Sequence, residues 1–511
     1  MTSPLDDLRG YLAWQESRGR LLRVRDELSP ILEIPAFLRH VMYQGGPTVL
    51  FENVRGHPGW RVAGNIFDSL ESFRQALGVE KLEDVGRRLV SMLESPIPTG
   101  LGEKISRLLE ARNMAAALPS KVRKAAFTEN VVDRDPLNVI PAFKTWPSDG
   151  GRYITFGLVI TRDPETGSHN MGVYRVMVKS GDKAVVHWQI HKRGAKAYQD
   201  IARQGERMPV AIVIGADPAT MFTGVAPVPP PMDKLLFAGI VRGKGLRVYQ
   251  LDSGLLVPAN AEVVIEGYVV PGEESEEGPF GDHWGFYDRP VEKYPVLHVE
   301  RIYYRDNPIF VGTIVGLPPL EDAVIGKAVE RIFLPITRIV FPEIVDIDLP
   351  VHGVFQGLLI VSIRKRYPGH GKKVGMGLLG VGQTSLTKIV VVVDEFVDVH
   401  DYGQVVWAVT SFVDPARDIL IVDHAHTDAL DPASRAPGLG SKIIIDATRK
   451  WREEAGRDPP EIVAPDPRIE EKVKSLLAKY GLRAADPWER LVKGYLAGTR
   501  GESRGRTGYT R

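Results

Sequence analysis

The chain has 511 residues, 43% of them hydrophobic, which is too long for one compact core and enough to fill the roughly two or three domains that we expect. Its 65 basic and 64 acidic residues are interspersed and leave a formal net charge of +1, so the charge pattern favours neither nucleic acid nor an anionic membrane as a partner. Because there is no cysteine, disulfides, thiolate metal sites and cysteine nucleophiles are excluded.

The sequence shows no signal for export or for membrane insertion. Its first residues lack a basic segment followed by an apolar one, and no apolar run reaches the roughly 20 residues that span a bilayer. We therefore expect a cytoplasmic protein without a membrane span. Asparagine and glutamine are scarce while arginine and glutamate are abundant, and this balance favours a thermophilic source.

Residues 1–120 are predicted to form an N-terminal α/β wrapper. Leu5, Leu8 and Leu12 recur at helical spacing, and residues 47–52 have the composition of a strand. From there to residue 318 the pattern changes to short β-rich runs broken by glycine and proline. The predicted strands are residues 153–161, 172–178, 184–189, 210–214, 261–270 and 296–304. Strands at such close spacing favour a β-barrel or a sandwich over a doubly wound sheet.

Residues 319–450 alternate helical and strand patterns, which predicts an α/β domain with a partly parallel sheet. The helix at 321–334 is expected to end at Pro335. The predicted strands are residues 357–363, 389–393, 419–422 and 441–446. Residues 451–511 are expected to form short helices and, from 498, a frayed tail rich in Arg and Gly. Because no aromatic residue is interleaved in that tail, we do not expect it to bind nucleic acid.

The segment Glu277-Gly-Pro-Phe-Gly-Asp282 places two carboxylates five residues apart, on a stretch that its glycines and proline keep from becoming helical. Two solvated acids on a surface turn are the plain alternative. However, the sequence His-Trp-Gly-Phe-Tyr follows Asp282 directly, and large rings around a carboxyl group keep its proton bound nearer neutral pH, as a general acid requires. This segment is therefore a candidate active-site loop.

Three further residues offer binding chemistry. Arg175 lies in a strand-like stretch, where it either pairs with an acid on a neighbouring strand or grips a substrate carboxylate through two parallel hydrogen bonds. Asn170 and His191 suit a divalent ion if a carboxylate joins them, although a capping asparagine and a surface histidine are the simpler interpretation. No P-loop, dinucleotide fingerprint, Gly-x-Ser-x-Gly elbow or His-Glu-x-x-His motif is present.

Five segments together resemble the UbiD family along nearly the whole chain. They are residues 153–161, 170–175, 277–287, Arg366-Tyr-Pro-Gly-His370 and Asp414-Pro-Ala-Arg-Asp418. The resemblance implies reversible, non-oxidative decarboxylation of aromatic or α,β-unsaturated acids with prenylated FMN and a divalent metal, usually Mn²⁺ or else Mg²⁺, often together with K⁺. It also implies an α+β multidomain fold. In this fold a wrapper (1–120) and a split β-barrel for the flavin (121–318) precede an α/β oligomerisation domain (319–450) and C-terminal helices (451–511).

The same resemblance assigns the site residues. Glu277, Arg175 and Asp282 match the catalytic triad, in which Arg175 holds the substrate carboxylate, Glu277 tunes Arg175 and Asp282 protonates the carbon that loses CO₂. Asn170 and His191 match two metal ligands. The third ligand is Asp233 if a one-residue shift is allowed; otherwise Lys234 takes its position, and its ammonium replaces the monovalent cation and contacts the cofactor phosphate. The residues implied to contact the flavin are Val173, Tyr174, Arg175, His187, Trp188, Gln189, Lys192, Arg193 and Lys388.

The substrate is left open among several acids. The thermophile-like composition and the basic residues around 179–193 favour trans-anhydromevalonate 5-phosphate, which the archaeal mevalonate pathway converts to isopentenyl phosphate. Polyprenyl-4-hydroxybenzoate and other aromatic acids are alternatives, and a non-catalytic flavin-binding module and a flavin reductase are rival functions. The resemblance further implies a flavin prenyltransferase as cofactor supplier and a homodimer or hexamer.

Overall fold

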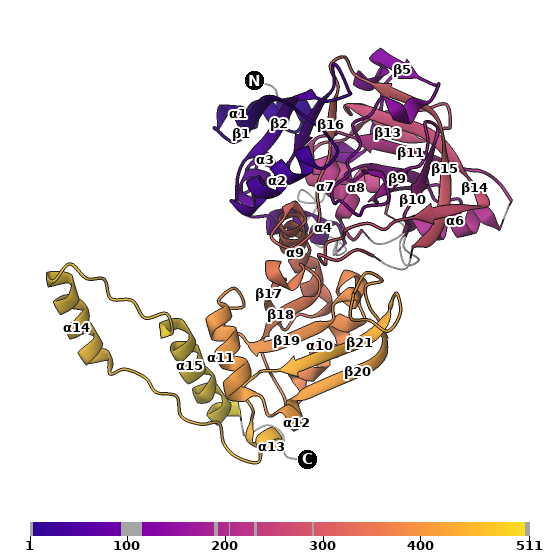
Figure 1. Cartoon of the computed structure of the whole chain (residues 1–511). Coiled ribbons are helices and arrows are strands. Elements are labelled where there is room, and N and C mark those ends of the chain that lie inside the picture. The colour runs from indigo at the N-terminus through magenta and orange to yellow at the C-terminus, as the bar shows by residue number, and fades with distance from the viewer. Residues whose placement is uncertain are drawn as a thin grey trace, which may run out of the picture. The chain divides into compact units, whose positions relative to one another are not determined.

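The computed structural model describes residues 4–93, 115–188, 193–203, 205–228, 232–288 and 291–505. It divides into two compact units, one of Met1–Ile336 with Ala429–Pro432 and the other of Thr337–Asp428 with Ala433–Arg511 (Figure 1). No helix among the described residues is long and apolar enough to cross a membrane. The α+β multidomain class is confirmed, whereas the four domain boundaries stay a prediction.

The first unit begins with a small four-stranded sheet in the order β1-β2-β3-β16. Its strands are β1 (Leu21–Leu28), β2 (Thr48–Val54), β3 (Arg61–Gly64) and β16 (Ile309–Val311). The helices of this region are α1 (Leu8–Ser17), α2 (Glu33–Tyr43), α3 (Leu70–Ala76) and α4 (Glu83–Leu93). Asp7 begins α1 by accepting a hydrogen bond from the backbone N–H of Gly10. The strand predicted at 47–52 is β2, whose first four residues are buried.

The second sheet of this unit has nine strands and curls into a half-barrel, in the order β6-β9-β10-β15-β14-β11-β7-β8 with β5 beside β15. The strands are β5 (Asn130–Val132), β6 (Arg152–Ile154), β7 (Leu158–Arg162), β8 (His169–Val173), β9 (Val176–Val178), β10 (Lys183–Val186), β11 (Met208–Ile214), β14 (Val263–Glu277) and β15 (Glu292–Tyr304). Two predicted strands are each broken in two, at 155–157 and at 174–175. The second break places Arg175 between β8 and β9, outside the regular ladder.

Smaller elements complete the first unit. A three-stranded sheet joins β13 (Leu256–Pro258), β12 (Arg247–Gln250) and β4 (Ser120–Lys121). The remaining helices are α6 (Arg193–Ala202), α7 (Pro218–Val225) and α8 (Lys234–Arg242), with 3-10 turns η1 (Ala126–Glu129) and η2 (Pro136–Asn138). Both α7 and α8 pack against β8, so they form a second layer behind the strand that carries Asn170.

Helix α9 (Glu321–Val340) corrects the prediction that Pro335 ends it, since Pro335 lies inside the helix. A proline removes only one helical hydrogen bond, and packing replaces the lost stability. Ala328, Ile332 and Leu334 are all buried, and Gly86 of α4 approaches so closely that a Cβ there would lie 2.0 Å from the Ile332 carbonyl oxygen.

The second unit is built on a five-stranded sheet in the order β17-β18-β19-β21-β20. Its strands are β17 (Ile344–Asp348), β18 (Leu358–Ile363), β19 (Ile389–Asp394), β20 (Ile419–His426) and β21 (Leu439–Asp446). The three central strands are parallel and the two edge strands antiparallel, so the sheet is partly parallel, which is as far as the prediction went. The helices are α10 (His370–Leu379), α11 (Tyr402–Phe412), α12 (Pro415–Asp418), α13 (Arg452–Ala455), α14 (Pro467–Lys479) and α15 (Glu489–Gly505), with 3-10 turns η3 (Val351–Gly353) and η4 (Gly382–Leu386).

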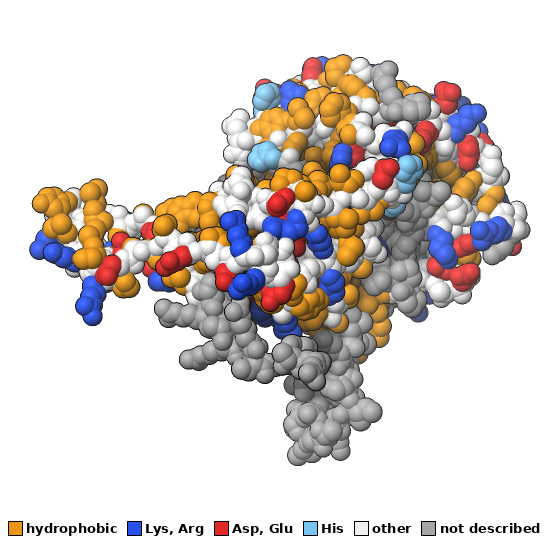
Figure 2. All heavy atoms as spheres, turned by 90° about the horizontal axis from the view of Figure 1, so that it is seen from below, with side chains coloured by type: hydrophobic (Ala, Val, Ile, Leu, Met, Phe, Trp, Pro, Cys, Tyr) orange, Lys and Arg blue, Asp and Glu red, His pale blue; other side chains and the backbone are white. Residues whose placement is uncertain are grey.

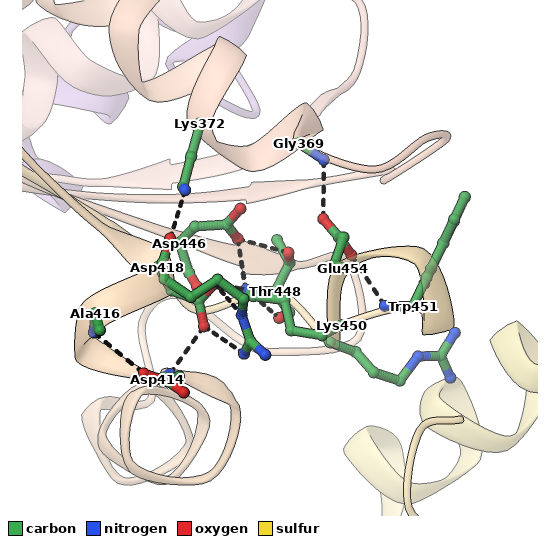
Figure 3. Close-up of polar contacts among 12 residues, drawn as sticks. Gly369, Lys372, Asp414, Ala416, Asp418, Asp446, Thr448, Lys450, Trp451 and Glu454 are labelled. Atoms are coloured by element: carbon green, nitrogen blue, oxygen red, sulfur yellow. Dashed lines mark hydrogen bonds and ion pairs between the residues drawn. The ribbon is translucent and has the colours of Figure 1, made fainter. Parts of the chain in front are cut away.

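A polar network lies at the carboxyl end of β21 (Figure 3). The Lys450 ammonium bonds the Asp446 carboxylate at 3.1 Å and the Thr448 carbonyl at 2.8 Å, while Glu454 accepts the Gly369 N–H at 2.8 Å. Lys372 donates to the Arg417 carbonyl. The segments 366–370 and 414–418, which carry part of the family resemblance, are thus joined to this network and stabilise the second unit.

The C-terminal region differs from its prediction in one respect. Helix α15 continues to Gly505, where the sequence suggested a frayed tail from 498, because no proline interrupts the helix once it has begun. Residues 506–511 lie outside the described part. Helix α14 has no buried residue, and Ile469, Val473 and Leu476 are exposed at helical spacing along it. Figure 2 shows further hydrophobic side chains exposed on the face that it draws.

Candidate active site

The loop after β14 is fixed by close packing and by Asp149. Gly278 has φ 97°, which glycine alone adopts without strain, and a Cβ on Gly150 would lie 2.1 Å from the Gly278 carbonyl oxygen. One oxygen of Asp149 accepts the Gly281 N–H at 2.9 Å, while the other accepts the Trp146 N–H at 2.8 Å. The two predicted acids at either end of this segment are therefore held in place.

Glu277 and Asp282 are both 2% exposed, which rules out the alternative of two solvated acids on a surface turn. Phe280, between them, packs with Tyr153, Met177 and Val185 in a small apolar cluster. The two carboxylates therefore lie beside apolar side chains, where water does not compete for their hydrogen bonds.

Arg175 forms a bidentate ion pair with Glu277. Its Nε donates to Oε1 at 3.0 Å and its Nη2 to Oε2 at 2.6 Å, and the guanidinium carbon lies 4.7 Å from the centre of the Phe280 ring. Nη2 also contacts a carboxylate that sequence reasoning missed, that of Asp288. An antiparallel β-bridge between Gly281 and Tyr287 folds the loop back and brings Asp288 opposite Phe280. The local sequence contains no pattern that predicts this pairing.

His187 completes the surroundings of Glu277. Its Nδ1 lies 2.9 Å from Oε2 of Glu277, and its ring centre lies 4.2 Å from that of Tyr294. Burial, together with the nearby Arg175 charge, lowers the pKa of His187. Because a carboxylate only accepts hydrogen bonds, Nδ1 is the nitrogen that donates to Glu277. Burial alone raises the pKa of Glu277, but the bonds from His187 and Arg175 outweigh it and bring the value to about 2. Glu277 is thus ionised under all ordinary conditions.

Asp282 has the opposite character. Burial raises its pKa to about 6, and the electrostatic interaction with His283 offsets only part of this rise. Among the described residues, its Oδ1 accepts the Trp284 backbone N–H at 2.7 Å. A carboxyl group that retains its proton near neutral pH is suited to general acid catalysis. Two acids in one loop whose pKa values are driven apart indicate a division of roles between them.

His187, Glu277 and Asp288 offer three ligand atoms within 4.8 Å of one another, a spacing that suits a metal ion. Arg175 already bonds both carboxylates of this group. The cation that neutralises them in the structure is therefore a guanidinium, and we assign no metal to this position.

Asn170, a predicted metal ligand, is the one whose surroundings suit a bound polar group. It is 4% exposed, and among the described residues its Nδ2 has no hydrogen-bond partner. Thr161, its register partner on β7, lies on the same face, and its Oγ1 also has none. Because an amide offers either its nitrogen or its oxygen, this buried polar pair fits a metal ion or a group that the ion carries.

Asp233 is engaged elsewhere. It begins α8 by accepting the Leu235 N–H on Oδ1 at 2.7 Å, and its Oδ2 accepts the His169 backbone N–H at 2.8 Å and lies 3.2 Å from His169 Nδ1. Side chains at 169 and 170 leave opposite faces of β8. The structure therefore pairs Asp233 with His169 rather than with Asn170. His191 lies outside the described residues, so the metal site stays a prediction.

The Lys234 ammonium is buried among main-chain carbonyls. It donates to Thr223 at 3.1 Å and to Ala226 at 3.0 Å, with the Gly224 oxygen at 3.5 Å. These oxygens belong to the C-terminal end of α7, where unpaired carbonyls favour a cation. A Cβ on Gly224 would lie 3.0 Å from a methyl of Val173, so this end of α7 supports the strand that leads to Arg175.

The predicted flavin-contact residues are described in part. Val173 is half-buried, while Tyr174 and Trp188 are buried with ring centres 6.5 Å apart, and the Trp188 Nε1 has no partner among the described residues. Gln189, Lys192 and the side chain of Arg193 lie outside the described part. Lys388 directly precedes β19 in the second unit. All of these contacts stay predictions.

Sequence profiles of three domains of the UbiD family match the chain. Residues 12–89 match the N-terminal domain of 3-octaprenyl-4-hydroxybenzoate carboxy-lyase, residues 120–318 its Rift-related domain and residues 323–447 its C-terminal domain. A protein of Aeropyrum pernix described only as uncharacterized is 56% identical over 484 residues, which make up 94% of this chain and 99% of that protein.

Two solved enzymes share the fold. The closed form of vanillic acid decarboxylase from Sedimentibacter hydroxybenzoicus is 30% identical with a TM-score of 0.79, covering 92% of this chain and 98% of its own. The UbiD-class enzyme HmfF from Pelotomaculum thermopropionicum in complex with FMN is 28% identical with a TM-score of 0.74, covering 93% of this chain and 100% of its own. An evolved dimeric form of HmfF in complex with prFMN is 26% identical, with a TM-score of 0.74, and covers 93% and 99%.

Proposed function

The chain belongs to the UbiD family of carboxy-lyases, and from this premise we propose that it removes CO₂ from an α,β-unsaturated acid with prenylated FMN and a divalent metal. The observation that carries the proposal is the contrast between the two loop acids. The ion pair with Arg175 keeps Glu277 ionised, whereas burial raises the pKa of Asp282 to about 6. A decarboxylase needs both a fixed cation for the substrate carboxylate and a proton for the carbon that remains.

The residues of this site divide the work as follows. Arg175 holds the substrate carboxylate with the edge of its guanidinium that Glu277 does not use, and Glu277 keeps that guanidinium charged and oriented. When bound, prenylated FMN supplies the electron sink for the pair left by CO₂. Asp282 donates its proton to the carbon from which CO₂ departs, and solvent then reprotonates Asp282.

For the metal we propose Mn²⁺ or Mg²⁺, held by Asn170 and His191. Asp233 would join them only by giving up its bonds to the His169 and Leu235 N–H groups. K⁺ is not needed at the end of α7, because the Lys234 ammonium already lies among its carbonyl oxygens. Lys234 thus replaces a monovalent cation in our proposal.

For the substrate we propose trans-anhydromevalonate 5-phosphate, converted to isopentenyl phosphate. The basic residues that favour a phosphate are partly occupied, since Lys183 pairs with Glu273 and Lys179 with the Glu276 carbonyl. A second candidate is an aromatic acid such as polyprenyl-4-hydroxybenzoate, supported by the 30% identity to a vanillic acid decarboxylase.

The test is an anaerobic assay of protein produced together with a flavin prenyltransferase and supplied with Mn²⁺ and K⁺. CO₂ and product are followed from trans-anhydromevalonate 5-phosphate, 4-hydroxybenzoate and cinnamate. Release from the phosphate alone supports both parts of the proposal, and release from an aromatic acid alone overturns the isoprenoid substrate. If no acid reacts although the flavin is bound, the result indicates either a different acid substrate or a non-catalytic flavin-binding module. Oxidation of NAD(P)H by the purified protein would instead indicate a flavin reductase.

A further inference from the structure

We propose that Asp288 is a carboxylate latch, which occupies Arg175 before the substrate binds and which the substrate carboxylate must displace. The inference rests on the proposed function and adds to it a residue that determines how tightly acids bind. Asp288 acts through Arg175 and is therefore a positioning residue.

The contacts of Arg175 show which part of the guanidinium is taken. Glu277 bonds its side edge, Nε and Nη2, at 3.0 and 2.6 Å. Asp288 contacts Nη2 from the other side, and among the described residues no group bonds Nη1. A carboxylate that binds end-on needs Nη1 and Nη2 together. Asp288 therefore occupies half of the edge through which Arg175 would grip a substrate.

The two acids beside Arg175 differ in how firmly they are held. Glu277 has a fully buried side chain and a second bond from His187, whereas the Asp288 side chain is 17% exposed. The other oxygen of Asp288 accepts the Phe280 N–H at 2.7 Å. That single N–H needs an acceptor but not a charge, so loop packing does not explain a carboxylate at this position. Asp288 is thus the acid that can leave.

The charges require it to leave. Among the described residues that bond the Arg175 guanidinium, Glu277 and Asp288 supply two carboxylates for its one positive charge, and burial together with the Arg175 charge lowers the pKa of His187. A substrate carboxylate that bound beside both acids would be repelled, because Arg175 neutralises only one of the two negative charges and the site is buried. If it replaces Asp288, however, the number of charges around the guanidinium is unchanged. The latch therefore keeps the buried arginine paired when the site is empty.

The experiment compares holoenzymes of the wild type and of Asp288→Asn, which retains an oxygen acceptor for the Phe280 N–H but loses the charge. Calorimetry measures the Kd of cinnamate and of 4-hydroxybenzoate, with the corresponding neutral amides as control ligands, and KM and kcat are measured for any acid that reacts. We expect the acids to bind about tenfold tighter to the variant and the amides to bind equally well to both proteins. The factor follows if Asp288 occupies Arg175 in roughly nine of ten wild-type molecules, because only the remaining tenth can then bind an acid.

A matched control separates the latch from simple loop support. Asp149→Asn disturbs the same loop without touching Arg175, so it should not tighten acid binding selectively. Acid binding that is unchanged or weaker in Asp288→Asn, at an unchanged melting temperature, overturns the latch. If the variant is unstable, Asp288→Ser is measured in its place and must show the same selective gain. If the enzyme turns over but the variants bind acids no more tightly, the proposed decarboxylase function stands and the latch is wrong. If neither acid binding nor turnover is found, both proposals are wrong.

Discussion

Glu277 and Asp282 lie five residues apart in one loop and are equally buried, yet the pKa of Glu277 is about 2 and that of Asp282 about 6. Burial raises both values, and the difference comes from partners. Glu277 accepts bonds from Arg175 and His187, while among the described residues Asp282 accepts a single backbone N–H. The loop thus separates a carboxylate that is ionised down to about pH 2 from one that takes up a proton near pH 6, without any difference in solvent exposure.

We expect Asp282→Asn to abolish turnover while leaving flavin binding intact. An amide cannot donate a proton to carbon, and loss of a general acid costs roughly 10²- to 10⁴-fold in rate. Because the acid must be protonated, kcat of the wild type should be highest below pH 6 and fall as the pH rises through about 6. The measurements are kcat against pH and the flavin spectrum of both proteins. A variant that turns over at more than a tenth of the wild-type rate would show that the proton comes from elsewhere.

The ion pair of Glu277 predicts a loss of stability in acid. Its pKa is lowered from 4.5 to about 2, so the stabilisation is fully present above pH 4.5 and is lost as the pH falls through 2. The difference corresponds to a free energy of unfolding on the order of 3 kcal/mol. Melting curves between pH 6 and pH 2 measure it. Glu277→Gln should melt at a lower temperature at pH 6 and show a smaller decline in acid; an equal decline would assign the acid sensitivity to other groups.

The sequence predicts most strands of the half-barrel because their composition is decisive, as in β11, where the residues from Val210 to Ile214 are all buried. It does not predict the breaks at 155–157 and 174–175, since a local β pattern is continuous there. At the first break a Cβ on Gly157 would lie 2.6 Å from the side chain of Ile212, a contact between distant segments. Local patterns also mislead at Pro335, where tertiary packing outweighs the helix-breaking residue.

Among the site residues, local sequence gives those within the recognisable loop and strand. Burial of Glu277 and Asp282 follows from the aromatic residues around them, whereas Asp288 reaches Arg175 only because the loop folds back on itself. Asp233 illustrates the opposite difficulty. The resemblance assigns it only to the metal site, whereas in the structure it caps α8 and pairs with His169.

Lys234→Met should destabilise the first unit, because it removes the donor for the carbonyls of Thr223 and Ala226 while keeping the length of the side chain. Loss of a buried, charged hydrogen-bond donor costs about 1 to 3 kcal/mol. If the ammonium takes the place of a monovalent cation, KCl should restore part of the melting temperature of the variant and LiCl should not. Lys244→Met, at an exposed lysine paired with Asp6, is the control and should melt like the wild type in both salts. Equal melting of Lys234→Met and wild type would contradict the role of Lys234.

Gly150→Ala tests whether the rigidity of the loop matters for catalysis. The added Cβ would lie 2.1 Å from the Gly278 carbonyl oxygen, and its three nearest neighbours are all main-chain atoms of Gly278 and Pro279, so no flexible side chain can move aside. The loop should therefore shift, with a loss of about 1 to 3 kcal/mol in the free energy of unfolding and a larger fall in kcat than in flavin affinity. Gly380→Ala is the control, since its Cβ would meet nothing closer than 3.7 Å. Denaturant unfolding and steady-state kinetics on both variants decide the matter. A fully active Gly150→Ala protein would mean that Glu277 and Asp282 tolerate movement of the turn that joins them.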